Sequence, residues 1–600
     1  MIWINLFVSN NNYAALQAGN NRGILMAVHN EDIARIFEEM ADLLEIEEAN
    51  PFRVRAYRNA ARTIRGLSRE LGQLIAEGKD LTDLPGIGKD LAAKINEILE
   101  TGTSIALEKL HKEVPVSVED LLKIPGLGSK RVKHLYHEMG IQNLDQLETA
   151  AGSGKLRTYP GFGARLEQNI LDNISALRSS QKRFLRNIAI TYAEPLVQYL
   201  KKDKTVKNVI IAGSYRRGRE SVGDLDILVT ADKAGRIMER FIKYEEVKHI
   251  VSNGPTRATV ILNCGLQVDL RLVPEKSFGS ALHYFTGSKA HNIRIRRMAQ
   301  QQGLKINEYG VFRGNTHVAG KTEESVFRSV GLTFIPPELR EDRGEIKAAL
   351  DHKLPDLVKL ADIKGDLHVH TIATDGRANI KAMALAAAKR GFKYLAITDH
   401  SRHLTVAHGL KPEQLLQQID EIEKLNSGLK GFTLLKGIEV DILEDGRLDL
   451  PDRVLAKLDL VVAAIHSKFN LSRKKQTVRL LRAMDNRYFS ILAHPSGRLL
   501  FEREPYDVDM EKIIRHARER GCFIELNSQP QRLDLTDIHC QLARDEGVLI
   551  AVNSDAHSEY GFDNIRFGID QARRGWLEKK DVLNTRPVNT LRNLLQKARS

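Results

Sequence analysis

The residues most able to support chemistry in this chain are three aspartates, Asp224, Asp226 and Asp269. Asp224 and Asp226 are two positions apart in a predicted strand, so their carboxylates face the same side, about 7 Å apart along the backbone. Asp269 falls in a later predicted strand and adds a third carboxylate. Carboxylates held together repel one another, and a multivalent cation relieves the repulsion. The pattern indicates two hard cations about 3.5–4 Å apart, the arrangement used for in-line phosphoryl transfer.

A glycine-containing turn precedes the first two aspartates. It reads Gly213-Ser214-Tyr215-Arg216-Arg217-Gly218 and follows a predicted strand at residues 209–212. Its backbone N–H groups, the Ser214 hydroxyl and the Arg217 guanidinium can together hold a triphosphate. An isolated Asp-x-Asp is usually only the polar face of a strand. The turn just upstream and Asp269 on a later strand favour a nucleotide site instead.

Residues 213–229 resemble the bacterial family X DNA polymerases, which have a polymerase-beta-like core. The resemblance continues into Tyr284-Phe285-Thr286-Gly287-Ser288 and Lys305-Ile306-Asn307-Glu308-Tyr309-Gly310. It implies gapped or nicked DNA and deoxynucleoside triphosphates as substrates. It also implies that Asp224 and Asp226 bind two Mg²⁺ or Mn²⁺ ions and that Asp269 binds the catalytic one. The implied nucleotide contacts are Gly213, Ser214, Arg217, Gly223, Tyr284, Phe285, Gly287 and Asn292, and the implied template contact is Arg296.

Two positions depart from or complicate that resemblance. Gln267 stands where many relatives have an arginine that restrains the third aspartate, and glutamine cannot do this by charge. Lys94 falls at the position of the 5′-deoxyribose-phosphate lyase nucleophile of the beta-like enzymes. A Schiff-base lysine needs desolvation or a neighbouring cation, for which Lys89 is available. However, Asp90 stands where that family often has lysine, so a solvated or phosphate-contacting Lys94 is an equal alternative.

A second set of nine metal-ligand residue types occurs in residues 364–600. The set is His368, His370, Asp375, His400, Glu439, His466, His494, Asp555 and His557. Each lies at or just after the carboxyl end of a predicted strand, where a β/α barrel gathers its active site. With the run at 522–527 there are seven such strands, so we expect a distorted seven-stranded β/α barrel. Nitrogen and oxygen ligands in this number suit two or three Zn²⁺ or Mn²⁺ ions.

The order of these nine residues resembles the polymerase and histidinol phosphatase (PHP) domain. That resemblance implies a metal cluster that activates water against phosphoesters. Beside a polymerase it implies a 3′-5′ exonuclease that processes 3′ ends, with abasic-site cleavage as a further option. Three alternatives stay open: a small-molecule phosphatase of the histidinol phosphatase type, a nucleotidyltransferase acting on something other than DNA, and a non-catalytic DNA-binding scaffold.

Three turns of the form Pro-Gly-x-Gly occur in the N-terminal part, beginning at Pro85, Pro125 and Pro160. Each precedes a predicted helix, whose free N–H groups can receive an anion. The turns resemble helix-hairpin-helix motifs, which hold a DNA backbone phosphate without reading sequence. The resemblance implies DNA contacts at Gly86, Gly88, Gly126 and Gly128.

The composition limits the partner and the class of protein. The chain has 600 residues, a net charge of +13, which favours a polyanionic partner, and three cysteines without metal-ligand spacing. No apolar run is long enough to span a membrane.

We expect a cytoplasmic, monomeric, multidomain enzyme of base excision repair. Its expected parts are a non-native or disordered extension at 1–25, with translation starting at Met26, a helical lyase-like domain at 26–110, helix-hairpin-helix fingers at 111–185, an α/β nucleotidyltransferase palm at 186–275, an α+β thumb at 276–340, a linker at 341–363 and a PHP metallophosphoesterase barrel at 364–600.

Overall fold

The structure is a computed structural model that describes most of residues 30–600. It leaves out 48, 66, 68–70, 102, 114–117, 119, 120, 122, 123, 125, 126, 128, 160, 161, 164, 165, 172, 175–182, 233, 598 and 600. The expected extension 1–25, Gly126 and Gly128 therefore lie outside the described residues, as does the start of the third Pro-Gly-x-Gly turn. None of the helices described combines the length and hydrophobicity needed to cross a bilayer. The chain divides into two compact units.

The first unit is helical. Its elements are α1 (Asn30–Ile46), α2 (Pro51–Arg65), α3 (Leu71–Ala76), η1 (Leu81–Asp83), α4 (Lys89–Thr101), α5 (Ile105–Glu113) and α7 (Ser129–His137). Apolar residues at helical spacing make one face of α1 buried, including Ile33, Phe37 and Met40. That face packs on α2, where the ring of Phe37 meets the ring of Tyr57 edge to face at 5.4 Å.

The first Pro-Gly-x-Gly turn joins η1 to α4. Gly86 has a φ of +80°, a left-handed conformation that favours glycine. The buried Ile87 anchors the turn, and its N–H donates to the Leu84 carbonyl at 3.1 Å. Gly86 and Gly88 are both exposed, directly before the N-terminus of α4. The predicted phosphate contact requires this placement.

The second unit begins with α8 (Leu144–Gly152) and η3 (Leu156–Thr158) and contains a five-stranded mixed sheet. The strand order is β2 (Val206–Ile211), β4 (Asp224–Ala231), β7 (Gln267–Leu272), β6 (Arg257–Leu262), β5 (Val247–Asn253). β4 and β7 are parallel, and the other pairs are antiparallel. The edge strand β5 is not among the strands that the sequence predicts, because its residues are largely exposed and lack an apolar pattern.

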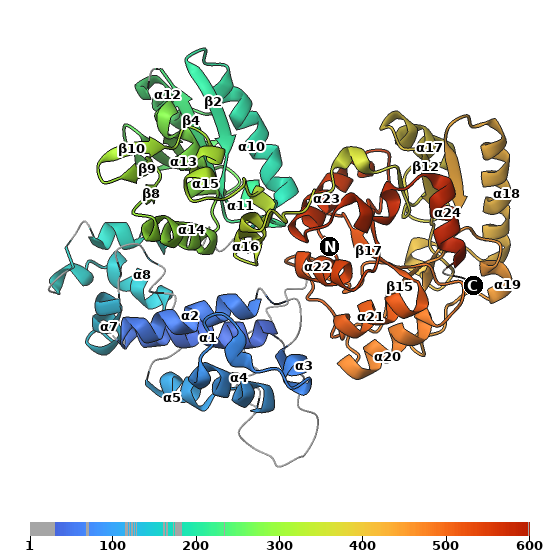
Figure 1. Ribbon diagram of the computed structural model, residues 1–600, viewed down its shortest axis with the longest axis horizontal. Helices are drawn as coiled ribbons and strands as arrows, with labels where there is room; N and C mark the ends of the chain where they lie inside the picture. Colours follow the sequence, from blue (N-terminus) through green and yellow to red (C-terminus); the bar gives the residue numbers. More distant parts are fainter. Residues whose placement is uncertain are drawn as a thin grey trace. The chain divides into compact units, whose positions relative to one another are not determined.

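Helices cover both faces of this sheet (Figure 1). α10 (Arg186–Lys201) and α12 (Ala234–Ile242) share one apolar cluster with the strands, and α13 (Phe278–Thr286) contributes to a second cluster with Ala212 and Leu228. A short pair, β1 (Phe184–Leu185) with β3 (Ser221–Val222), and the one-turn helix α11 (Gly213–Arg216) complete this part. The predicted nucleotide-binding turn is therefore α11, between β2 and β4.

Residues 276–363 form a second α+β part. Its elements are η4 (Glu275–Ser277), α13, α14 (Lys289–Gln301), β8 (Lys305–Asn307), β9 (Gly310–Arg313), β10 (Thr316–Ala319), α15 (Glu323–Ser329), η5 (Pro337–Leu339), α16 (Glu345–Leu350) and η6 (Leu360–Asp362). The expected linker, 341–363, is packed rather than open. Its Ile346 and Leu357 are buried in one cluster with Phe327 of α15 and Trp576 from near the end of the chain.

The C-terminal part alternates parallel strands and helices. The strands are β11 (Gly365–Asp366), β12 (Tyr394–Ile397), β13 (Thr433–Lys436), β14 (Glu439–Asp441), β15 (Val462–Ala464), β16 (Ile491–Leu492), β17 (Phe523–Asn527) and β18 (Ile550–Asn553). The helices are α17 (Ile380–Lys389), α18 (Pro412–Gly428), α19 (Asp452–Leu455), α20 (Arg473–Met484), α21 (Met510–Arg520), α22 (Asp537–Asp545), α23 (Ile565–Arg574) and α24 (Val588–Lys597), with η7 to η10 between them.

These strands form two parallel sheets, β11-β12-β13 and β14-β15-β16-β17-β18. Single parallel bridges join them at both edges, between His400 and Glu439 and between Val369 and Ala556. The third predicted strand is interrupted at Gly437, where a Cβ atom would come within 2.8 Å of the Ile397 carbonyl. Alternate residues of the strands meet in one interior cluster that also holds Leu591 and Leu595 of α24.

A buried charge triad ties α11 to α15. Glu323, at the start of α15, accepts hydrogen bonds from Arg216 at 2.6 Å and from Arg340 at 2.6 Å. Arg340 is fully buried. Burial opposes ionisation of Glu323, but the two guanidinium groups outweigh it and lower its pKa to about 2. The carboxylate is therefore charged and holds two cations that would otherwise repel each other.

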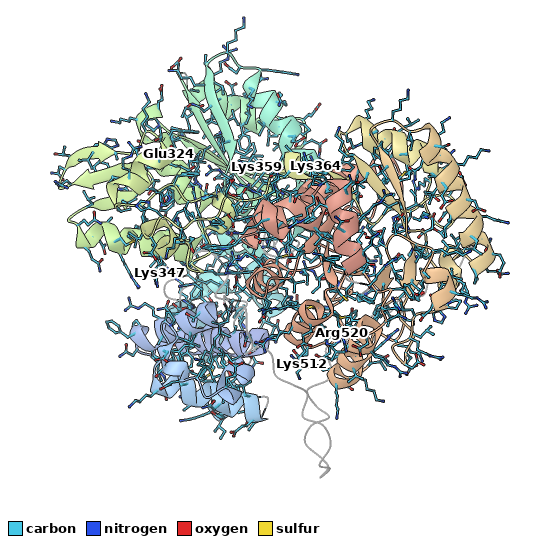
Figure 2. The ribbon with its side chains drawn as sticks, turned by 45° about the vertical axis from the view of Figure 1, so that its right-hand side comes forward. Glu324, Lys347, Lys359, Lys364, Lys512 and Arg520 are labelled. Atoms are coloured by element: carbon cyan, nitrogen blue, oxygen red, sulfur yellow. The ribbon has the colours of Figure 1, made fainter. Side chains whose placement is uncertain are left out.

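Replacing Glu323 by glutamine should destabilise this part of the protein by about 3–5 kcal/mol, because Arg340 would be left buried without its counter-charge. Denaturant unfolding followed by Trp576 fluorescence measures the loss, since Trp576 lies in the adjoining apolar cluster. The folded-state pKa is depressed, so the deficit should be full above the ordinary value of 4.5 and shrink as the pH falls toward 2. The neighbouring Glu324→Gln, at an exposed position (Figure 2), is the matched control and should change little. Equal effects of the two substitutions would contradict this account.

Candidate active sites

Strand register brings the three predicted aspartates, the carboxylate trio Asp224, Asp226 and Asp269, to one end of the sheet. β4 and β7 run parallel, and Asp226 lies directly opposite Asp269. Asp224 lies two residues before Asp226 on β4 and opposite Gln267. Asp226 is half-buried and Asp269 is buried. Their ligand oxygens are less tightly grouped than those of the histidine sites described below, which lie within 4.8 Å of one another.

The pKa of Asp226 is shifted by this arrangement. Burial, together with the charges of Asp224 and Asp269, raises its pKa to about 7. Its Oδ2 atom lies 2.7 Å from where a Cβ on Gly213 would be, and Gly213 has a φ of +62°. Glycine is thus required at the start of α11 both by the backbone and by the approach of this carboxylate. Crowded carboxylates whose ionisation is suppressed by one another are a donor set that fits a divalent cation.

Asp269 is fixed by three donors from its own and the adjacent strand. The Thr259 hydroxyl donates to its Oδ1 at 2.6 Å, and the Gln267 amide donates to its Oδ2 at 2.8 Å. Arg257, on the antiparallel strand β6, donates to Oδ1 at 3.1 Å. Gln267 therefore restrains Asp269 by a hydrogen bond. Gln267 has no positive charge, and Arg257 supplies one beside Asp269 instead. Sequence reasoning missed Arg257 because only the β6–β7 register brings it there.

The predicted triphosphate residues surround α11, and one of them is already engaged. Arg217 donates to Glu341 Oε1 at 3.0 Å and to the Thr286 carbonyl at 2.5 Å. Gly287 lies close by, since a Cβ there would be 3.2 Å from Arg217 Nη1. Ser214 is half-buried within α11, and Gly223 directly precedes β4. A triphosphate would have to compete with Glu341 for the Arg217 guanidinium.

Glu341 in turn is held by the C-terminal domain. Arg574 of α23 donates to Glu341 Oε1 at 2.9 Å, to the Arg217 carbonyl at 3.0 Å and to Asp537 Oδ2 at 2.8 Å. Burial works against the charge of Glu341, but Arg574 and Arg217 outweigh it and lower its pKa to about 2. A second contact joins the same two regions, because Arg498 donates to Glu220 Oε2 at 2.8 Å.

The remaining predicted nucleotide and template residues cluster on α13 and α14. The rings of Tyr284 and Phe285 lie 5.0 Å apart, and the Arg271 guanidinium lies 4.3 Å from the Phe285 ring centroid. Asn292 is buried and donates to the Tyr284 carbonyl at 2.7 Å. Arg296 follows one turn later and is half-buried. These residues therefore lie on two consecutive helices, α13 and α14.

Lys94 lies in the other unit, on α4. Its Nζ atom is 2.6 Å from Asp90 Oδ1, one helical turn earlier. An ion pair with a carboxylate stabilises the charged ammonium, whereas Schiff-base formation requires the neutral amine. The contact gives Lys94 a partner on its own helix, which favours the structural or phosphate-contacting alternative.

The nine predicted ligands of the C-terminal part, called the histidine cluster from here on, meet around Glu439. Glu439 oxygens lie 2.8 Å from His400 Nδ1, 3.0 Å from His494 Nε2 and 3.3 Å from His466 Nε2. His368 Nε2 lies 3.4 Å and His370 Nε2 3.5 Å from the same carboxylate. Asp375 follows β11 by a short loop and Glu439 begins β14, whereas the other ligands lie a few residues after the ends of β11, β12, β15, β16 and β18.

The cluster falls into three overlapping groups of possible ligands. These are His370, Asp375, His400 and His557; His368, His370 and Asp555; and His400, Glu439 and His466. Within each group one ligand atom per residue lies within 4.8 Å of the others. His370 and His400 each belong to two groups, so the groups are adjacent. His494 joins through its contact with Glu439.

The charges in the cluster are balanced by shifted protonation. Burial works against a charged His400, but Glu439 and Asp375 outweigh it and raise its pKa to about 10. In the same way Glu439 and Asp441 raise the pKa of His466 to about 8, against burial. Burial, with His557 and His400 as neighbours, lowers the pKa of His370 to about 4. Cations bound at the cluster would take the place of these protons.

The cluster fits metal ions on a further ground. Both ring nitrogens of His370, Nε2 of His368 and Oε2 of Glu439 are buried and make no hydrogen bond among the described residues. Buried polar atoms are normally satisfied, so such a concentration indicates a missing partner. Imidazole and carboxylate donors together suit a borderline divalent metal.

Two buried carboxylates, Glu525 and Asp441, lie behind ligands of the cluster, and sequence reasoning missed Glu525. Glu525 on β17 lies 2.7 Å from His368 Nδ1 and accepts from the His494 N–H at 2.8 Å. Asp441 lies 3.2 Å from His466 Nδ1. A carboxylate behind a ligating histidine fixes the ring and its tautomer. The one available signal was a glutamate in the otherwise apolar strand run 522–527.

Family models match five stretches of the chain. They are a helix-hairpin-helix domain at residues 28–104, a SAM-like helix-hairpin-helix tandem at 118–175, a DNA polymerase beta palm at 189–267, a DNA polymerase beta thumb at 281–341 and a PHP domain at 366–529. Asp224 and Asp226 lie inside the palm match, and Asp269 lies two residues beyond it. Asp555 and His557 lie beyond the PHP match, although the structure brings them into the histidine cluster.

Whole-chain similarity agrees with these matches. The chain is 39% identical over 574 residues to the DNA polymerase/3′-5′ exonuclease PolX of Bacillus subtilis, covering 95% of this chain and all of that protein. Its C-terminal part is 32% identical to a protein named probable phosphatase of Thermoanaerobacter sp. (37% of this chain, 89% of that protein) and 34% identical to one of Caldanaerobacter subterraneus (39% and 91%). With its helix-hairpin-helix, palm, thumb and PHP regions in this order, the chain belongs to the bacterial family X DNA polymerases that carry a PHP domain.

Proposed function

We propose that this protein is a gap-filling DNA polymerase of base excision repair with a separate 3′-5′ exonuclease site that processes 3′ ends. The observation that carries the proposal is the register of β4 and β7, which sets Asp226 opposite Asp269 beside the α11 turn. The relative from Bacillus subtilis supports this proposal, because its name gives both activities and the similarity extends over its whole length. The substrates proposed are gapped or nicked DNA and deoxynucleoside triphosphates, bound by a monomer.

In the polymerase site, Asp224, Asp226 and Asp269 would hold two Mg²⁺ or Mn²⁺ ions. Such ions supply Lewis acidity that favours ionisation of the primer 3′-hydroxyl and neutralises the triphosphate. The protein contributes the rest. Arg257, Thr259 and Gln267 fix Asp269, the α11 N–H groups and Arg217 receive the phosphates, and Tyr284 and Phe285 would pack on the sugar.

In the PHP site, the histidine cluster would hold two or three Zn²⁺ or Mn²⁺ ions. Ions of this kind activate water for attack on a phosphodiester. Glu525 and Asp441 would keep His368 and His466 in the orientation that ligation needs. A phosphatase acting on a small molecule is the second candidate, favoured only by the names of relatives that match the C-terminal part alone. Phosphate release from histidinol phosphate, compared with synthesis on a gapped duplex, separates the two.

Asp226→Ala should reduce nucleotide incorporation on gapped DNA by on the order of a thousandfold or more, because the shared cation site loses a ligand. Affinity for the DNA and exonuclease activity should change little. Primer extension and an equilibrium binding assay on the same duplex measure the two effects. Asp232→Ala, at an exposed aspartate just past the end of β4, is the control. Incorporation near the wild-type rate in Asp226→Ala would refute the assignment.

His368→Ala and Asp555→Ala should each abolish 3′-5′ exonuclease activity and lower the metal content of the purified protein, while gap filling persists. The reason is that each removes a ligand from the buried group containing His370. Digestion of a 5′-labelled strand and elemental analysis are the measurements. His516→Ala, on α21 and outside the cluster, serves as the control. Joint loss of exonuclease and synthesis would mean that the two sites are not separate.

For Lys94 we expect no Schiff-base adduct on a 5′-deoxyribose-phosphate end, because its Nζ atom is engaged by Asp90 of the same helix. Borohydride trapping followed by gel electrophoresis tests this with wild type, Lys94→Ala and Asp90→Ala. A strong adduct that is present in wild type and lost in Lys94→Ala would establish the lyase role instead.

A further inference from the structure

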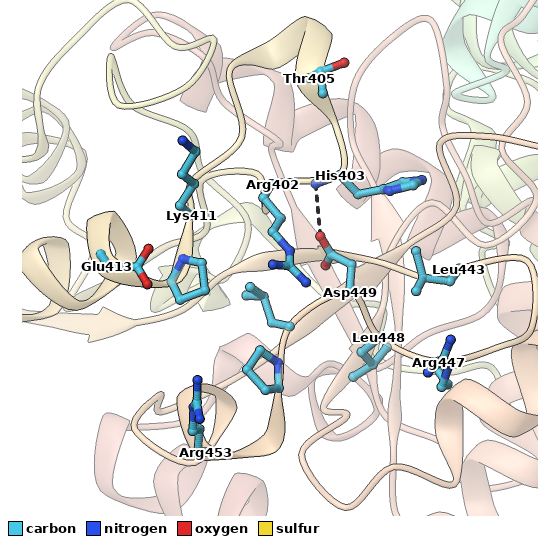
Figure 3. A pocket seen from close by; sticks show the side chains of 13 residues that line it. Arg402, His403, Thr405, Lys411, Glu413, Leu443, Arg447, Leu448, Asp449 and Arg453 are labelled. Carbon is cyan, nitrogen blue, oxygen red and sulfur yellow. Dashed lines mark hydrogen bonds between the residues drawn. The ribbon is translucent and has the colours of Figure 1, made fainter.

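A cavity of about 1070 Å³ lies in the C-terminal domain beside the histidine cluster. It is formed by the loop between β12 and α18, by the first turn of α18, and by residues 443–453, which run from the loop after β14 into α19 (Figure 3). None of the nine cluster residues lines it. It is therefore a separate feature, and neither the polymerase chemistry nor the proposed cleavage chemistry uses it.

The cavity carries unneutralised positive charge. Four cationic side chains line it, Arg402, Lys411, Arg447 and Arg453, against two carboxylates, Glu413 and Asp449. Arg447 is paired with Asp445 at 2.6 Å. Arg402, Lys411 and Arg453 are exposed and have no carboxylate partner among the residues that the structure describes.

One of the two carboxylates is engaged by the protein itself. Asp449 accepts from the Ser401 hydroxyl at 2.7 Å and from the His403 N–H at 3.0 Å (Figure 3 shows the second contact). Asp449 therefore braces the loop, and Arg402, Lys411 and Arg453 still outnumber the two carboxylates of the lining. An anion entering the cavity meets an excess of donors.

The same contacts connect the cavity wall to the cluster. Ser401 directly follows His400, and its hydroxyl accepts from the Asp441 N–H at 3.0 Å. Asp441 lies 3.2 Å from His466 Nδ1. The loop that carries Arg402 therefore begins at a ligand of the cluster, His400.

We propose that this cavity binds the phosphodiester backbone of the DNA strand whose 3′-terminal nucleotide is cleaved at the histidine cluster, with Arg402, Lys411 and Arg453 contacting successive phosphates. The proposal rests on the exonuclease function proposed above. The cations are spread around a volume far larger than one phosphate needs, which favours a polyanion over a free mononucleotide. Apart from His403, no aromatic ring lines the cavity, so the contacts would be to the backbone and independent of sequence.

The test uses the full-length protein with Arg402, Lys411 and Arg453 all changed to alanine. The probes are a single-stranded oligonucleotide and the p-nitrophenyl ester of thymidine 5′-monophosphate, which reaches the cluster but has no further phosphates. We expect kcat/KM on the oligonucleotide to fall about tenfold or more at physiological salt. The slope of log(kcat/KM) against log[salt] should shrink by about 2, since each single-strand phosphate contact contributes about 0.7. Hydrolysis of the small ester should be unchanged.

A matched variant removes three cations elsewhere on the same domain, Lys389, Lys430 and Lys512, all exposed and none lining the cavity. It should behave as wild type, which separates local contacts from net charge. If the triple cavity variant loses activity on the small ester too, the three single variants replace it, each expected to lower the salt slope by about 0.7. If the triple cavity variant shows the same oligonucleotide kinetics and salt slope as the matched variant, this inference is overturned and the proposed exonuclease function still stands. A wild-type protein inactive on both substrates overturns the proposed exonuclease function, and this inference with it.

Discussion

Negative charge gathered away from water is the constraint on which both sites depend. In the sheet, parallel pairing of β4 with β7 sets Asp226 opposite Asp269, and burial together with the charges of Asp224 and Asp269 raises the pKa of Asp226 to about 7. Such an arrangement is costly for an empty protein and favourable once divalent cations are bound. The supporting residues make sense in that light, because Arg257, Thr259 and Gln267 hold Asp269 where repulsion would otherwise displace it.

The histidine cluster meets the same constraint with different side chains. Glu439 is surrounded by imidazole rings. The pKa values of His400 and His466 are raised and that of His370 is lowered, so only some of the rings carry a positive charge beside the carboxylates. Glu525 and Asp441 lie behind the rings of His368 and His466 and fix the orientation of these two imidazoles. The proposed polymerase site thus consists of oxygen donors, whereas the proposed PHP site is a buried mixture of nitrogen and oxygen donors.

Residues that act through local spacing could be predicted from the sequence. Asp224 and Asp226 share a strand face, and the cluster ligands follow apolar runs, so both sets are visible in the order of residue types. Arg257, Glu341 and Arg574 could not be predicted, because their partners lie on other elements and are chosen by register and packing. β5 escaped prediction as an exposed edge strand, and the third C-terminal strand is divided at Gly437 by close contact with a neighbour. The segment 341–363 has a linker-like composition but is packed, because Ile346 and Leu357 find an apolar surface.

The contact between Arg574 and Glu341 spans 233 residues of sequence and fixes the partner of Arg217 in the polymerase site. Arg574 belongs to α23, close to the carboxyl terminus. A ribosome therefore makes Arg217 and Glu341 well before it makes Arg574. During synthesis Glu341 can pair with Arg217 alone, and its second cationic partner is added only when α23 has been translated.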